Sequence, residues 1–180
     1  MFSTLSPTLL EKVKKIRLLI LDVDGILTTG ALFYGPKGES IKTFHVHDGL
    51  GIQLLQKFSV KIAIISSKKS PAVMNRLKHL TIKYLYLGSK NKLLSYNDLK
   101  QKLRLSDDAI AYMGDDLPDL PVLQRVGLAI TVPEALEIVQ QHVHWVTKHP
   151  GGQGAVREVC DTILFAQNHY ESMLKPYLEN

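Results

Sequence analysis

Short apolar runs alternate with segments of helical period along most of the chain. Each run is too short for a core helix and has few polar positions, which is typical of a strand buried on both faces of a parallel sheet. Ser70-Pro71 is a helix start signal, and residues 90–103 place leucines at helical spacing. This alternation predicts an α/β fold, a doubly wound, Rossmann-like parallel sheet with helices on both faces. The four expected strands are residues 17–23, 60–66, 109–114 and 126–131.

One segment interrupts the alternation. Residues 31–46 contain two strand-like runs around a Gly-Pro-Lys-Gly turn, so an antiparallel β-hairpin is expected just after the first strand. Residues 154–180 are expected to form a C-terminal helix and a tail, whose order the pattern leaves open. A chain of 180 residues suits one folded unit, so we predict a single domain over residues 1–180.

The composition excludes several classes of protein. Lys and Arg outnumber Asp and Glu by 22 to 17, a net charge of +5 that favours anionic ligands, but no basic-aromatic cluster indicates nucleic acid. No apolar run approaches the ~20 residues of a membrane-spanning helix. No signal peptide is recognisable, so a cytoplasmic protein without membrane contact is expected. Cys160 is the only cysteine, which rules out an internal disulfide and a multi-cysteine metal site.

Carboxylates gather where the expected strands end. Asp22 and Asp24 follow the first apolar run, and Asp115, Asp116 and Asp119 follow the third. The carboxyl ends of parallel strands meet at one edge of the sheet, where ligands bind. Crowded carboxylates repel one another and cost free energy to bury, so a divalent cation is expected among them. Oxygen donors without cysteine favour Mg²⁺.

A hydroxyl and an ammonium group are expected at the same edge. Ser66 ends the second apolar run, and Lys92 opens the helix that lies before the third. A magnesium ion with few protein ligands usually binds phosphate oxygens as well, which makes phosphoryl chemistry the leading class. A single Asp-X-Asp pair would more often be a turn or a helix cap, so the inference depends on the whole set.

The set resembles the four motifs of the haloacid dehalogenase-like phosphatases. These are "DVDGILT" from Asp22, then Ser66, Lys92, and "GDDLPD" from Gly114. "FHVHDGLGI", "KKSPAV", "NKL", "YMGDDLPDLPV" and "PGGQGAVREVC" are further similar to the family of 3-deoxy-D-manno-octulosonate 8-phosphate phosphatases, over residues 17–167. The resemblance implies a haloacid dehalogenase-like fold and Mg²⁺-dependent release of phosphate from that sugar acid phosphate, through an aspartyl-phosphate, in lipopolysaccharide sugar biosynthesis.

The resemblance also implies a role for each motif residue. Asp22 would attack phosphorus, and Asp24 would act as general acid and then as general base. Ser66 and Lys92 would bind the transferring phosphoryl oxygens. Mg²⁺ would be held by Asp22, the backbone carbonyl of Asp24, and Asp115. The remaining acids of the fourth motif, Asp116 and Asp119, are expected to orient Lys92 or metal-bound water.

Substrate-binding positions follow from the same resemblance, with departures. Arginine is common in the family where this chain has His47, Lys68 and Gln153, and Ser67 replaces a usual glycine. Because lysine lacks the bidentate grip of arginine, a related nine-carbon keto-deoxy sugar acid phosphate is an alternative substrate. A metal site at His45, His47 and Asp48 is a weaker alternative, since residues two apart on a strand share a face. The expected channel residues are Asp24, His45, Val46, His47, Asp48, Gly49, Gln53, Lys68, Arg76 and Lys92.

A homotetramer is the expected assembly. About 43 residues separate Asp24 from Lys68, which is too few for the separate cap domain that covers the site in many of these phosphatases. The resemblance implies that hairpins such as residues 31–46 associate between subunits and that a segment near "GGQGAVRE" reaches a neighbour's site. A neighbouring subunit is therefore expected to cover the small anionic substrate.

An alternative of another class is a receiver-like phosphoaspartate signalling module. Such modules also gather aspartates and Mg²⁺ in a doubly wound sheet, but they hold the phosphoryl group for long periods. A general acid at Asp24 favours a phosphatase instead.

Overall fold

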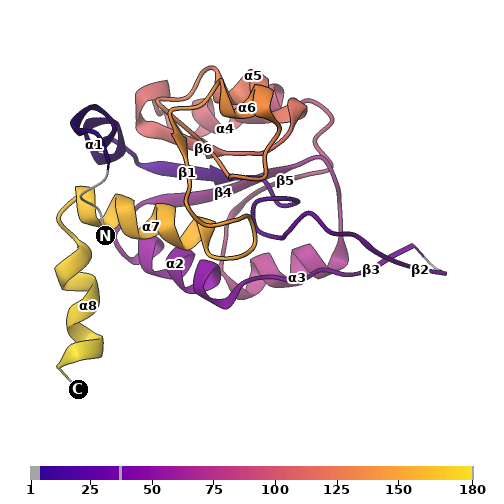
Figure 1. The fold of residues 1–180 in the computed structure, drawn as a ribbon, viewed down its shortest axis with the longest axis horizontal. Coiled ribbons are helices and arrows are strands. Elements are labelled where there is room, and N and C mark those ends of the chain that lie inside the picture. Colours follow the sequence, from indigo (N-terminus) through magenta and orange to yellow (C-terminus); the bar gives the residue numbers. More distant parts are fainter. Residues whose placement is uncertain (1–4, 37, 180) are drawn as a thin grey trace.

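Six parallel strands form the centre of the molecule, in the order β5-β4-β1-β6-β7-β8 (Figure 1). This computed structural model describes residues 5–36 and 38–179, with only the backbone of residues 39 and 40. The central strands β1, β6 and β7 are buried along their whole length, which confirms the predicted parallel sheet. The strands are β1 (Leu18–Leu21), β4 (Lys61–Ser66), β5 (Tyr84–Leu87), β6 (Ile110–Met113), β7 (Leu128–Thr131) and β8 (Trp145–Val146).

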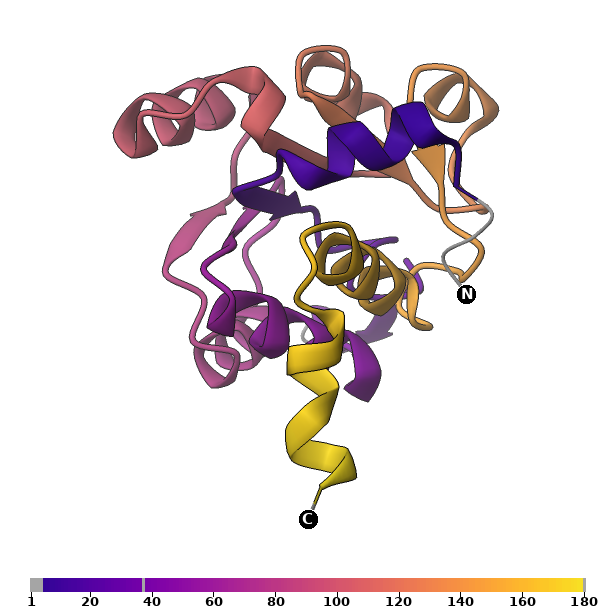
Figure 2. The ribbon, with the colours of Figure 1, turned by 90° about the vertical axis from the view of Figure 1, so that its left-hand side faces the viewer.

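Helices cover both faces of the sheet. Helices α4, α5 and α6 lie above it in Figure 1, and α2, α3 and α7 lie below it; the turned view of Figure 2 shows the same two layers. The helices are α1 (Pro7–Lys14), α2 (Val46–Lys57), α3 (Pro71–His79), α4 (Lys92–Leu103), α5 (Leu120–Leu123), α6 (Glu137–Gln140), α7 (Ala155–Ala166) and α8 (Tyr170–Leu178), with 3-10 turns η1 (Asp107–Ala109) and η2 (Leu117–Asp119). None of the described helices has both the length and the apolar composition needed to cross a membrane.

Helices α3 and α4 begin close to where the sequence predicts. Ser70 is the N-cap residue of α3 and Pro71 its first residue, although the Ser70 side chain makes no cap hydrogen bond. Asn91 caps α4, because its side chain accepts from the backbone N–H of Leu94. The helix ends at Leu103 and is followed by Arg104, which adopts a left-handed conformation. Lys92, the first residue of α4, is thereby fixed at the carboxyl edge of the sheet.

The predicted hairpin is present but shorter than residues 31–46. Strands β2 (Phe33–Gly35) and β3 (Gly38–Ile41) pair antiparallel and extend away from the sheet (Figure 1). The expectation that residues 42–46 continue the strand is wrong, as is the placing of His45–Asp48 on a strand. Helix α2 starts at Val46, and the Asp48 carboxylate accepts from the N–H groups of Gly154 and Arg157. This contact with a distant segment anchors a helical turn that the local pattern does not reveal.

Strands β5 and β8 were not predicted, and neither were the short helices α1, α5 and α6. β5 is only half-buried, so its alternating tyrosines and leucines do not form a clear apolar run, and β8 has two residues. The C-terminal tail, whose order the sequence left open, forms α8, with Met173 buried against the core. These elements are specified by packing against their neighbours more than by their own patterns.

Candidate functional site

A pocket of about 290 Å³ opens at the carboxyl ends of β1, β4 and β6. It lies at the point where the strand order reverses. From β1 the sheet continues to β4 on one side and to β6 on the other, and ligands bind at such points in open parallel sheets. The N–H of Asp22 donates to the carbonyl of Met113, which ties the end of β1 to that of β6. The pocket is lined by Asp22, Asp24, Gly25, Gly30, Ser66, Ser67, Lys68, Lys92, Asp115, Asp116 and Pro118.

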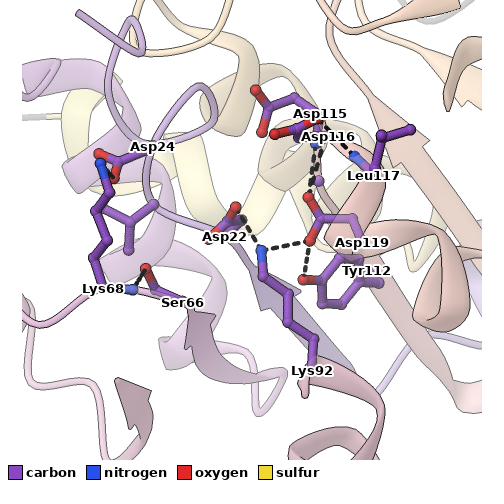
Figure 3. Close-up of polar contacts among 12 residues, drawn as sticks. Asp22, Asp24, Ser66, Lys68, Lys92, Tyr112, Asp115, Asp116, Leu117 and Asp119 are labelled. Atoms are coloured by element: carbon purple, nitrogen blue, oxygen red, sulfur yellow. Dashed lines mark hydrogen bonds and ion pairs between the residues drawn. The ribbon is translucent and has the colours of Figure 1, made fainter. Parts of the chain in front are cut away.

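Lys92 links two carboxylates at the base of this pocket (Figure 3). Its Nζ lies 2.7 Å from Oδ2 of Asp22 and 2.7 Å from Oδ1 of Asp119, and the lysine is buried. Burial lowers the pKa of Lys92, but the charges of Asp22 and Asp119 outweigh this effect and raise the pKa above its ordinary value. The ammonium therefore stays charged and can stabilise a phosphoryl group that reaches Asp22.

Asp119 is held by four donors. Its Oδ1 accepts from Lys92 and from the hydroxyl of the buried Tyr112, and its Oδ2 accepts from the backbone N–H groups of Asp115 and Asp116, each at 3.2 Å. With these contacts made, Asp119 is better suited to hold Lys92 and the Asp115 loop than to bind a metal. Tyr112 is a site residue that was not among those expected from the sequence. A single tyrosine in an otherwise aliphatic strand was the available signal, because its buried hydroxyl needs a partner.

Asp22 and Asp115 could hold a divalent cation. With Asp119, they offer oxygens within 4.8 Å of one another. Burial, followed by the neighbouring carboxylates, raises the pKa of Asp22 to about 6 and that of Asp115 to about 7. Among the described residues, Oδ1 of Asp115 is buried without a hydrogen-bond partner. A cation would reduce the repulsion between the carboxylates and would give Oδ1 of Asp115 a partner. The donor set therefore fits a hard metal ion.

Gly25 lets the loop after β1 approach the Asp115 carboxylate. Its φ of 80° lies in the left-handed region, and a Cβ at this position would lie 2.0 Å from Oδ2 of Asp115. The glycine that follows the Asp22 and Asp24 pair is therefore required by the neighbouring carboxylate as well as by the turn.

Asp24 faces a different set of charges from Asp22. Its side chain lies outside the group of Asp22, Asp115 and Asp119 and makes ion pairs with Lys42 and Lys68. Lys68 lines the pocket, and its Nζ lies 3.8 Å from Oδ2 of Asp24. Figure 3 shows the two side chains next to each other. Lys42, which was not among the expected site residues, contacts Oδ1. No sequence motif contains Lys42, because the folding of the hairpin brings it to Asp24 from 18 residues away in the chain.

Ser66, the last residue of β4, is buried beside the pocket. Its hydroxyl oxygen accepts from the backbone N–H of Lys68 at 3.4 Å. This contact holds the turn that follows β4, and it brings Ser67 and Lys68 to the pocket with exposed side chains. The hydroxyl hydrogen remains available for a phosphoryl oxygen.

Within one chain, three of the expected channel residues line this pocket: Asp24, Lys68 and Lys92. His45, Asp48, Gly49 and Arg76 lie together in a separate, tightly packed crevice that Phe44 also lines, where Nη2 of Arg76 donates to the His45 carbonyl at 3.4 Å. The remaining three expected residues lie on α2 with exposed side chains, Gln53 in a surface groove; they are Val46, His47 and Gln53.

The weaker alternative of a histidine metal site finds no geometric support in the described part of the chain. The rings of His45 and His47 meet edge to face with centroids 5.0 Å apart, and Asp48 is turned toward the N-terminus of α7. No group of three metal donors within the described ranges includes any of these residues. The physical reason is that the segment is helical, so side chains two apart do not share a face.

Comparison with known proteins places this geometry in a family. The family model described as haloacid dehalogenase-like hydrolase matches residues 66–159. The 3-deoxy-D-manno-octulosonate 8-phosphate phosphatase of Salmonella typhimurium is 43% identical over 166 residues, covering 92% of this chain and 88% of the relative.

Solved structures show the same relationship. A probable YrbI family phosphatase from Pseudomonas syringae superposes with a TM-score of 0.95 at 44% identity, covering 97% of this chain and 99% of the other. The 3-deoxy-D-manno-octulosonate 8-phosphate phosphatase of Moraxella catarrhalis, solved with magnesium, phosphate and KDO, has a TM-score of 0.91 at 39% identity and covers 94% and 97%. The chain therefore belongs to the haloacid dehalogenase-like hydrolases and, within them, to the family of 3-deoxy-D-manno-octulosonate 8-phosphate phosphatases.

Proposed function

We propose that the chain is a Mg²⁺-dependent phosphatase that releases phosphate from 3-deoxy-D-manno-octulosonate 8-phosphate through an aspartyl-phosphate intermediate. The observation that carries this proposal is the Asp22 carboxylate at the end of β1, held 2.7 Å from Lys92 and beside Asp115 in an open pocket. A carboxylate, an ammonium and a cation-binding oxygen thus converge where a phosphoryl group would be transferred.

Each residue has a role that its surroundings support. Asp22 attacks phosphorus in line, so that the bond to the sugar oxygen breaks as an acyl phosphate forms. Asp24 donates a proton to the departing oxygen and then takes one from the water that hydrolyses the acyl phosphate. Lys92 and the Ser66 hydroxyl hydrogen-bond the phosphoryl oxygens during both displacements. The products are inorganic phosphate and the free sugar acid.

Asp22, Asp115 and the backbone carbonyl of Asp24 are the proposed protein ligands of Mg²⁺. The raised pKa values of Asp22 and Asp115 and the unpaired Oδ1 of Asp115 support this assignment. When bound, Mg²⁺ neutralises the crowded carboxylates and the charge of a phosphoryl group. Asp119 is left out of the set because its oxygens are already occupied by four donors.

The substrate class is tested by comparing kcat/KM for eight-carbon and nine-carbon phosphorylated keto-deoxy sugar acids and for simple sugar phosphates, with Mg²⁺ present. The relatives named above and the rim cation Lys68 support an acidic sugar phosphate, and we expect the eight-carbon acid to be preferred. A preference for the nine-carbon acid would point to the alternative substrate. Equal rates for acids and simple sugar phosphates, or activity that survives a chelator, would refute the proposal.

A homotetramer is part of the proposal. The pocket is open in a single chain, and the hairpin carries exposed apolar side chains, with Phe33 48% and Tyr34 70% exposed. Apolar surface of this kind favours association with another copy. Light scattering with activity measurements across protein concentration tests this, and a fully active monomer would contradict it. The cytoplasmic location expected from the sequence stays a prediction.

A further inference from the structure

Lys42 reaches the candidate general acid from outside the pocket. It follows the last residue of β3, and its chain neighbours Ile41 and Thr43 are exposed. Its own side chain is only 2% exposed, and its ammonium pairs with Oδ1 of Asp24. Lys42 is absent from the pocket lining, whereas Asp24 is part of it. A substrate in the pocket would therefore touch Asp24 but not Lys42.

We propose that Lys42 is a positioning residue for Asp24, which rests on the proposed function of Asp24 as general acid and base. The contact occupies Oδ1 and restrains the rotation of the carboxylate. Oδ2, which faces the rim cation Lys68 at 3.8 Å, is then the oxygen that remains for proton transfer. A charge-assisted hydrogen bond from a buried ammonium can hold this orientation more firmly than an exposed lysine can.

The two lysines that pair with Asp24 differ in exposure and in placement. The Lys68 side chain is 53% exposed and lines the pocket, so it is available to the substrate. Lys42 is enclosed, so its ammonium has little access to water and depends on its protein partners. Because Lys42 directly follows β3, the contact also ties the base of the hairpin to the loop that carries Asp24.

The first test compares Lys42→Met and Lys42→Arg with the wild type, using Mg²⁺ and the preferred sugar acid phosphate. General acid and base catalysis is worth about 10²–10⁴-fold, so a misaligned Asp24 should lower kcat by roughly 10–100-fold. KM should change by less than about 3-fold, because Lys42 does not contact substrate. Lys42→Arg keeps a cationic donor and should restore at least part of kcat. Lys100→Met, which breaks a lysine–aspartate pair outside the site, is the matched control and should keep wild-type kcat.

The second test asks whether Lys42 acts through Asp24. In an Asp24→Asn background, adding Lys42→Met should lower the residual kcat by less than about 2-fold, because coupled residues are not additive. A full multiplicative loss in the double variant would overturn the proposal. An unchanged kcat in Lys42→Met, or a rise in KM with kcat unchanged, would overturn it as well, the latter by indicating direct substrate contact.

Further measurements distinguish a loss of Asp24 positioning from a loss of folding, of Mg²⁺ binding or of the proposed substrate preference. Mg²⁺ affinity of Lys42→Met should match the wild type within the effect of Lys100→Met, and kcat is measured well below the melting temperature of each variant. If Lys42→Met does not fold, Lys42→Gln replaces it, with a smaller kcat loss because the amide keeps an uncharged donor. The variants are also assayed with p-nitrophenyl phosphate, which needs no sugar acid specificity. If the wild type hydrolyses only this aryl phosphate, the proposed substrate fails while the Lys42 test still stands for the general-base step, because p-nitrophenolate leaves without a proton from Asp24. If Asp24→Asn is fully active, both the role of Asp24 and that of Lys42 fail.

Discussion

Asp22 and Asp119 contact the same ammonium group, but their remaining contacts give them different chemistry. Asp119 accepts from four donors and is completely buried, so its side chain is held in one orientation. Asp22 lines the pocket, and burial raises its pKa to about 6. A carboxylate that is less stabilised by donors is the better nucleophile and the better metal ligand.

Replacing Asp22 by Asn should abolish catalysis. The amide keeps the size of the side chain but removes the nucleophilic oxygen, so phosphate release with Mg²⁺ should fall by at least ~10³-fold, as for other covalent catalysts. Steady-state phosphate release measures this effect. Asp98→Asn, which alters a surface contact with Tyr86 away from the pocket, is the control. Substantial turnover by the Asp22 variant would defeat the assignment of Asp22.

Tyr112→Phe should weaken the support of Lys92 without removing it. The change deletes one hydrogen bond to the Asp119 carboxylate, which should lower the free energy of unfolding by about 1.5–3 kcal/mol. Three donors to Asp119 remain, so kcat should fall less than about 10-fold. Urea unfolding and steady-state kinetics test both values. A kcat loss as large as that of Lys92→Met would mean that Tyr112 contributes more than one supporting contact.

At the scale of elements, three loops form one unit at the carboxyl edge. The loop after β1 meets Asp115 through Gly25, and it meets the segment before α7 through Gly152, whose N–H donates to the Ile26 carbonyl at 2.8 Å. Gly151 packs on the Gly25 carbonyl so closely that no Cβ would fit. These contacts fix the position of the Asp22 loop relative to the Asp115 loop. The ends of β1 and β6 alone would leave these two loops freer to move relative to each other.

Gly25→Ala should disturb the metal site through this packing. The new Cβ would collide with Oδ2 of Asp115 and the φ of 80° would be strained, so Mg²⁺ affinity should fall by about 10-fold or more, as for other changes beside metal ligands. Calorimetric Mg²⁺ titration measures this loss. Gly38→Ala is a matched control, because its φ of 100° is also left-handed but its Cβ meets no atom within 4 Å. An equal loss in both variants would show backbone strain, rather than the collision, to be the cause.

For the whole molecule, the crowded carboxylates make stability depend on pH and on Mg²⁺. The pKa values of Asp22 and Asp115, about 6 and about 7, lie above the ordinary 3.8, so the folded protein holds protons that the unfolded chain has released. Without metal, these groups should therefore lower the free energy of unfolding as pH rises from 3.8 through about 7. Mg²⁺ competes with those protons, so its stabilising effect should grow over the same range.

Melting temperatures from pH 5 to 8, with chelator and with Mg²⁺, test this dependence. Asp115→Asn should melt higher than the wild type at pH 8 in chelator, by about 2–4 °C for each kcal/mol of relieved repulsion. The same variant should gain little from Mg²⁺. A Mg²⁺-induced shift of equal size at pH 5 and pH 8 would contradict the raised pKa values.

Local patterns determined the architecture and the positions of the strand-end carboxylates. Apolar runs separated by helix start signals predict a parallel sheet, because a strand that is buried on both faces has a nearly continuous apolar sequence. Asp22 and Asp115 follow directly from that sheet, because parallel strands end at one edge. The half-buried β5, the two-residue β8 and the start of α2 at Val46 lack such a pattern, so they were missed or misplaced.

The sequence by itself thus determined the four inner strands of the sheet, the edge at which chemistry is expected and the residue types gathered there. Only the tertiary structure decided that Tyr112 and Lys92 share Asp119, that Lys42 arrives at Asp24, and that His45 and Gly49 lie apart from the main pocket in one chain. The physical reason is that periodicity and capping report interactions within a few residues. Contacts between distant segments depend on how the elements pack, and no local pattern contains that packing.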